Sequence, residues 1–87
     1  MSTRSVVLDI PEKILLAEKM NTEAFARELR MLAAVKLYEM GRLSSGRAAE
    51  LAGVPRVEFL LNLRRYQVFP LEAELLALEG EGEKGHQ

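Results

Sequence analysis

Five arginines are concentrated in one short segment of this 87-residue chain, where their side chains could bind phosphate groups. The segment, residues 42–65, contains only two glutamates and has a net charge of +3, whereas the whole chain has a net charge of −1. Guanidinium groups donate several hydrogen bonds in a fixed geometry that suits phosphate oxygens. We therefore predict that these arginines bind nucleic acid; the simpler interpretation is that they are exposed side chains of a small helical domain. The five are Arg42, Arg47, Arg56, Arg64 and Arg65.

The element that would position these arginines is residues 44–60, which read SSGRAAELAGVPRVEFL and have the pattern of a helix-turn-helix. Such a motif needs small residues where its helices cross, a turn residue that tolerates unusual backbone angles, and buried apolar residues. A serine at 44 or 45 would cap the first helix, and Pro55 would open the second. The predicted core of the motif is Ala48, Ala49, Ala52, Gly53, Val54 and Phe59.

The face that the second helix would turn outward is too apolar for a helix that reads bases freely. With the turn at Gly53, Arg56 and Arg64 are the only residues of this face that can donate hydrogen bonds to nucleic acid. Phosphate contact is therefore better supported than base-specific reading, for which Arg56 is the best candidate. The apolar residues of this face would have to be shielded from water, either by residues 71–79, by a second subunit or by a partner protein. They are Val57, Leu60 and Leu61.

The N-terminal sequence RSVVLDIP alternates with a period of two, which predicts a strand over residues 4–10. Val6, Leu8 and Ile10 share one face of this strand. Since a single strand leaves its backbone groups unpaired, it needs a partner. That partner is either the short extended piece at residues 67–69 or the same strand of a second subunit. We do not expect the strand itself to read DNA, because an aspartate on its outer face would repel phosphate.

The rest of the chain reads as helices, over about residues 11–20, 22–40, 45–52, 55–65 and 71–79, followed by a polar tail at 80–87 that we expect to be disordered. The helix at 22–40 has two apolar stripes, so it should be covered on two sides, within the chain and by a second subunit. The alternative is a central helix in a monomer. The predicted dimer or partner interface comprises Val6, Leu8, Met31, Val35, Tyr38, Val57, Leu60 and Leu61.

These features predict one small, mainly α domain over residues 1–79: a short N-terminal strand followed by a helical domain that contains the helix-turn-helix. A chain of this length has a thin core, and dimerisation is a common remedy. We therefore predict a homodimer.

The sequence resembles uncharacterised protein family 0175, a group of small prokaryotic proteins suggested to be antitoxins of toxin–antitoxin pairs. The resemblance is carried by AVKLYEMGRLSSGRAAELAGVPRVEFL, residues 34–60, together with the N-terminal LDIPEKIL. In that family a helix ending in KLYxxGxLS runs into GxAAxLAGxSRxEFL, and the matching segments here keep this order and spacing. Two residues depart from the pattern: Pro55 stands where the family often has serine, and Val57 where tryptophan is common. The resemblance implies an antitoxin-like DNA-binding protein.

We do not expect this protein to be an enzyme, to contain a metal site or to be a membrane protein. The chain has no cysteine, and its single histidine, His86, lies in the polar tail, so neither a nucleophile–base pair nor a zinc site can be assembled. The apolar runs are too short for a membrane span or a signal peptide. We expect a cytoplasmic protein that uses no cofactor, metal or small-molecule substrate.

Three functional hypotheses remain. The first is an antitoxin-like transcription regulator that binds DNA near its own operon, its operator, with the arginines on phosphate. The second is a protein-interaction module that neutralises a toxin or joins an assembly without touching DNA. The third is a structural homodimer whose apolar faces are all buried in the dimer. The first two are compatible, and the first is the one that the positive segment and the resemblance favour.

Overall fold

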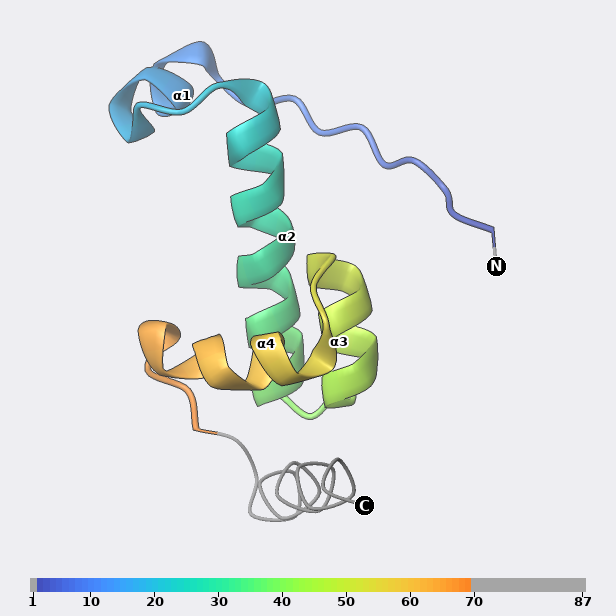
Figure 1. The fold of residues 1–87 in the computed structure, drawn as a ribbon. Coiled ribbons are helices and arrows are strands. Elements are labelled where there is room, and N and C mark those ends of the chain that lie inside the picture. The colour runs from blue at the N-terminus through green and yellow to red at the C-terminus, as the bar shows by residue number, and fades with distance from the viewer. Residues whose placement is uncertain (1, 70–87) are drawn as a thin grey trace, which may run out of the picture.

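The computed structural model describes residues 2–69, and this part of the chain is mainly helical, as the sequence predicted. Four α-helices follow one another: α1 (Glu12–Glu18), α2 (Thr22–Glu39), α3 (Ser45–Ala52) and α4 (Arg56–Asn62), with a 3₁₀ helix η1 (Leu63–Tyr66) directly after α4. In Figure 1 the long helix α2 forms the axis of the molecule. Helix α1 lies at one end of α2, whereas α3 and α4 lie at the other end. The helix predicted at residues 71–79 and the tail at 80–87 fall outside the described residues.

The start of α2 is determined by local signals. The side chain of Asn21 accepts a hydrogen bond of 2.8 Å from the backbone N–H of Ala24, which would otherwise have no partner in the first turn. The acidic side chain of Glu23 lies in the same turn, where the helix dipole favours negative charge. The short helix α1 before it buries none of its side chains. It therefore adds little to the core.

Residues 2–10, which we call the N-terminal arm, form no strand in this structure, so the predicted strand at residues 4–10 is absent from the single chain. No strand occurs anywhere within residues 2–69. Residues 67–69, the predicted partner within the same chain, therefore do not pair with residues 4–10 either. The physical reason is the absence of a pairing edge: a strand satisfies its backbone groups only beside another strand. The arm instead extends from the α1 end of α2 without secondary structure (Figure 1), and several of its residues line a groove together with residues of α2 and α3.

Helix α3 is bounded by a serine cap and a glycine turn. The Ser44 hydroxyl accepts a hydrogen bond of 3.2 Å from the N–H of Arg47 at its start. At its end, Gly53 has a φ of +78°, and the N–H of Val54 donates to the carbonyl of Ala49, which closes the helix in the manner of a Schellman motif. Pro55 then precedes α4, so the two helices are separated by a tight turn.

Alanine substitutions at Gly53 and Gly46 are expected to change stability in opposite directions. Gly53→Ala is expected to lower the free energy of unfolding by about 1–2 kcal/mol, because a side chain disfavours the left-handed backbone conformation. The Arg30 side chain, 3.4 Å from the added Cβ, restricts it further. Gly46→Ala, inside α3, meets nothing within 4 Å and should raise stability by roughly 0.5 kcal/mol. Urea unfolding followed by circular dichroism measures both. Equal effects of the two substitutions would contradict the turn at Gly53.

The second predicted helix of the motif is shorter than residues 55–65. It forms α4 as far as Asn62 and then tightens into η1. The Asn62 side-chain amide donates a hydrogen bond of 2.9 Å to the carbonyl of Glu58, one turn earlier in the same helix. This polar residue therefore bonds within its own helix, and the end of an α-helix is a common place for the chain to become 3₁₀.

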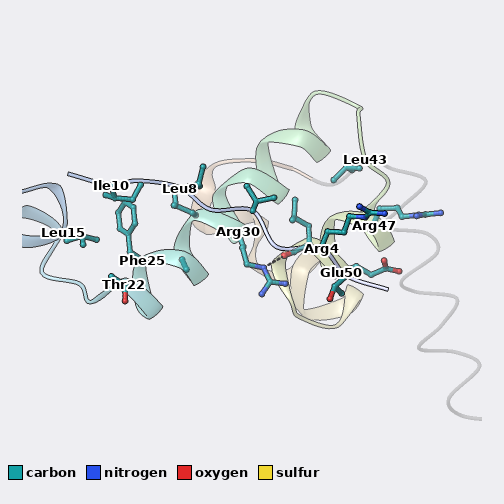
Figure 2. Close-up of a pocket in the computed structure, with 15 residues that line it drawn as sticks. Arg4, Leu8, Ile10, Leu15, Thr22, Phe25, Arg30, Leu43, Arg47 and Glu50 are labelled. Atoms are coloured by element: carbon teal, nitrogen blue, oxygen red, sulfur yellow. Dashed lines mark hydrogen bonds between the residues drawn. The ribbon is translucent and has the colours of Figure 1, made fainter. Parts of the chain in front are cut away.

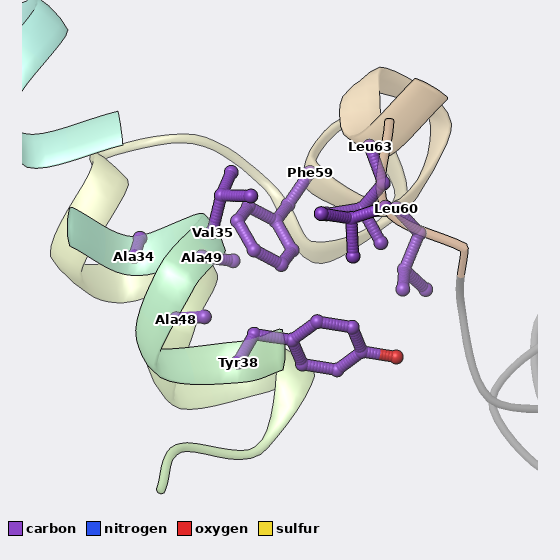
Figure 3. Close-up of a cluster of buried hydrophobic side chains, with 9 residues drawn as sticks. Ala34, Val35, Tyr38, Ala48, Ala49, Phe59, Leu60 and Leu63 are labelled. Carbon is purple, nitrogen blue, oxygen red and sulfur yellow. The ribbon is translucent and has the colours of Figure 1, made fainter. Parts of the chain in front are cut away.

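The core lies where α2, α3 and α4 meet (Figure 3). Alanines at 34, 48 and 49 are fully or almost fully buried, which lets α2 and α3 approach closely. Phe59 of α4 fills the space between them, and its ring meets that of Tyr38 edge to face, with 5.7 Å between ring centroids and 87° between planes. The other buried apolar residues are Val35, Leu60, Leu63 and Val68.

Three residues predicted for a dimer or partner interface are instead buried in this core: Val35, Tyr38 and Leu60. A fourth, Met31, is half-buried and packs against it. Of the two stripes on α2, the one that contains Met31, Val35 and Tyr38 faces α3 and α4, whereas Leu32 and Met40 of the other stripe are exposed. The helical period distinguishes two stripes but does not say which one the same chain will cover.

Candidate nucleic-acid interface

The predicted phosphate-binding arginines surround the α3–α4 pair. Arg42 is exposed in the turn between α2 and α3, and Arg47 is exposed in the first turn of α3. Arg64 and Arg65 are exposed in η1, just past the end of α4. The structure therefore places these exposed positive charges before α3, in its first turn and just past the end of α4.

Arg56 differs from the other four because its side chain is half-buried and holds two helices together. Its Nε–H donates a hydrogen bond of 2.8 Å to the Oγ of Ser45, which is buried at the start of α3. This contact ties the first turn of α4 to the first turn of α3. Arg56 therefore has a structural role that its sequence position did not reveal, and it is a poorer candidate for base reading than the sequence suggested.

The exposed face of α4 is apolar and acidic. Val57 is partly exposed and Leu61 has 66% of its surface exposed, while the side chain of Glu58 is also exposed between them. Neither apolar side chain donates a hydrogen bond to a base edge, and the carboxylate would repel phosphate. Leu60, predicted on this face, points into the core instead.

The predicted core residues of the motif lie at its centre. Ala48, Ala49 and Phe59 are buried, and Ala52 and Val54 are partly buried against them. Gly53 supplies the turn. These residues hold the relative orientation of α3 and α4.

Arg30 is a contributor to this unit that the sequence reasoning missed. From α2, its Nε–H donates a hydrogen bond of 2.8 Å to the carbonyl of Leu51, 21 positions later, near the end of α3 (Figure 2). The same guanidinium lies beside Gly53. No local sequence pattern predicts this hydrogen bond, because it depends on how α3 packs against α2.

A groove of about 1090 Å³ lies between the N-terminal arm, α2 and α3. Figure 2 shows Leu8 and Ile10 of the arm on the same side as Phe25 of α2, with charged side chains toward the α3 end. The charged residues that line it are Arg4, Arg30, Arg47 and Glu50. Arg47 therefore lies both beside this groove and on α3.

Within residues 2–69, no three side chains of histidine, cysteine, aspartate or glutamate are placed to hold a metal ion. In the same part of the chain, no helix is long and apolar enough to cross a membrane.

Comparison with known proteins gives a family but no activity. The model of an uncharacterised protein family, UPF0175, matches residues 1–83. A curated UPF0175 protein of Archaeoglobus fulgidus is 44% identical over 52 residues, which make up 60% of this chain and 59% of that relative. The matched region thus spans less than two thirds of the relative's length. No solved structure matches the chain.

Proposed function

The chain belongs to the uncharacterised protein family UPF0175, and from this premise we propose that it is a small antitoxin-like transcription regulator that binds DNA as a homodimer. It acts in the cytoplasm, on its own operator, and has no catalytic activity. The family's name assigns no function, so the proposal rests on the α3–α4 unit, used as a helix-turn-helix.

The observation that carries the proposal is the exposed positive charge around the α3–α4 unit. Arg42 and Arg47 are exposed before α3 and in its first turn, and Arg64 and Arg65 are exposed just past the end of α4. Guanidinium groups at these positions would suit the phosphates along the edges of a DNA groove. Arg56 would keep its hydrogen bond to Ser45 and hold α4 against α3.

The test is fluorescence anisotropy with the full chain, using the duplex upstream of its own gene and a scrambled duplex of the same composition over a salt series. The variant carries Arg47→Gln and Arg64→Gln, both at exposed positions; Arg56 is left intact because it binds Ser45. Because a homodimer carries each substitution twice, the loss of four phosphate contacts should weaken binding at least about tenfold and reduce the slope of log K against log salt by about 4.

The matched control carries Lys13→Gln and Arg27→Gln, which remove the same charge from exposed positions on α1 and α2. We expect this control to bind nearly as the original chain does. If both variants lost the same DNA affinity, the loss would be an effect of net charge and would contradict the arginine interface. Equal affinity for the native and scrambled duplexes would contradict operator recognition, and no binding at low salt would contradict DNA binding altogether.

The second candidate function is neutralisation of a toxin without DNA. It is favoured by the exposed apolar pair Val57 and Leu61, which lie four positions apart on one face of α4 and suit a protein partner better than a base edge. Co-expression with the protein encoded beside it tests this function. The original chain should relieve growth arrest, and Val57→Asp with Leu61→Asp should not. Persistent arrest with the original chain would contradict the function.

A further inference from the structure

Helix α3 is held near both of its ends by a guanidinium group, and each group comes from a different helix. Near the C-terminal end of α3, the Nε–H of Arg30 of α2 donates to the carbonyl of Leu51, at 2.8 Å. At the N-terminal end, the Nε–H of Arg56 of α4 donates to the Oγ of Ser45, also at 2.8 Å. Of these two bonds, only the second joins α3 to α4, the two helices of the proposed DNA-binding unit.

The hydrogen bond between Ser45 and Arg56 is sheltered from water. Ser45 has 2% of its surface exposed, and the side chain of Arg56 is half-buried. Water competes less for a hydrogen bond in such a place, and the lower local dielectric constant strengthens its electrostatic attraction. The bond is therefore able to hold the two helices in one arrangement.

The apolar contacts between α3 and α4 determine their relative orientation less sharply than this bond does. Phe59 of α4 belongs to the same core cluster as Ala48 and Ala49 of α3 (Figure 3). Burial of apolar surface is non-directional, whereas a guanidinium group donates its hydrogen bonds in a fixed geometry. The bond from Arg56 to Ser45 thus selects one orientation of α4 among those that would bury Phe59.

This orientation matters for DNA because the exposed arginines belong to different elements. Arg47 lies in the first turn of α3, whereas Arg64 lies in η1, directly after α4. A change in the angle between α3 and α4 would change the distance between these two guanidinium groups. Phosphate contacts fix the position of a protein on the duplex, so both groups must be presented at the correct spacing.

We propose that Arg56 is a positioning residue for DNA binding: through its hydrogen bond to Ser45 it orients α4 on α3, and it does not itself hold a phosphate. The inference rests on the proposed function and deepens it, since it separates the arginine that builds the interface from those that contact DNA. Loss of one hydrogen bond changes the population of the bonded orientation by about tenfold. Because only the correctly oriented fraction binds, affinity for the native duplex should fall by a similar factor of about ten.

Three variants of the full chain distinguish positioning from phosphate contact. Ser45→Ala removes the acceptor and no charge, and Arg56→Met removes both the donor and the charge. Arg56→Gln removes the charge but keeps an N–H donor, because its amide nitrogen is as many bonds from Cα as the Nε of arginine. Fluorescence anisotropy with the native duplex over a salt series measures affinity, and far-UV circular dichroism at the same temperature shows that each variant is folded.

We expect Ser45→Ala and Arg56→Met to weaken binding equally, by about tenfold, with the salt slope of the original chain. Arg56→Gln should restore most of the affinity. Normal binding by Ser45→Ala together with weak binding by Arg56→Gln, and a slope reduced by about 2 in the homodimer, would show that Arg56 holds a phosphate and would overturn the proposal.

The matched control is Arg30→Met, which removes the same charge and the hydrogen bond near the other end of α3. It leaves α3 joined to α4, so it should lower the urea midpoint but bind DNA nearly as the original chain does. Equal loss of affinity in Arg30→Met and Arg56→Met would indicate general loosening and overturn the inference.

The failure of this inference and that of the proposed function give different results. If Ser45→Ala is less stable than the original chain but binds the native duplex equally well, the bond only stabilises the fold and the inference alone is overturned. If the original chain binds no DNA at low salt, the proposed function is overturned and the inference with it.

Discussion

Replacing Phe59 by alanine is expected to lower the free energy of unfolding by about 3–5 kcal/mol, a large part of the stability of so small a domain. Phe59 is completely buried, and it is the side chain through which α4 packs against α2 and α3. Its removal leaves a cavity and also ends the edge-to-face contact with Tyr38. Urea unfolding followed by far-UV circular dichroism at one fixed protein concentration measures the loss.

The matched control for this substitution is Leu61→Ala, two positions later on the same helix. Leu61 is mostly exposed, so its truncation should change stability by less than about 0.5 kcal/mol. A similar loss in both variants would mean that α4 does not pack through Phe59.

Replacing Ala48 by leucine is expected to cost about 1–3 kcal/mol through overpacking. Ala48 of α3 has no exposed surface, and it belongs to the same core cluster as the equally buried Ala34 of α2, against which helix α3 packs. A leucine there has no space unless the two helices move apart. The same unfolding measurement applies, and a loss of side-chain signal dispersion in an NMR spectrum would report a loosened core.

Ala33→Leu on α2 is the control for this second substitution. Ala33 is exposed, and alanine and leucine have similar helix propensities, so this variant should unfold close to the original chain. If Ala48→Leu unfolds at the same denaturant concentration as Ala33→Leu, α3 does not cross α2 at this residue.

Local signals in the sequence were sufficient for the helical elements and for the family. Asn21 and Ser44 cap their helices through residues three positions away, and Gly53 turns the chain through its own φ angle. Such signals act within one or two helical turns, so a single sequence displays them. The mainly helical class and the family membership predicted on these residues are confirmed. The predicted phosphate contacts and the homodimer stay predictions.

The strand predicted at residues 4–10 is absent from the single chain. The reason is that an alternating sequence can be recognised locally, whereas a strand also needs a neighbour to pair with. The alternation of residues 4–10 is an intrinsic property of the sequence, and the arm retains it along the groove. A ladder of hydrogen bonds, in contrast, requires a neighbour that this chain does not supply among residues 2–69.

The sequence by itself therefore determined the order and approximate positions of the helices within residues 2–69, the small residues at their crossing and the excess of arginine around the motif. Only the tertiary structure decided that Val35, Tyr38 and Leu60 face inward, that Arg56 binds Ser45, and that Arg30 of α2 reaches Leu51 of α3. The physical reason is the range of the interactions. Caps and turns involve neighbours in the chain, whereas burial and cross-helix hydrogen bonds depend on which helix faces are brought together by packing.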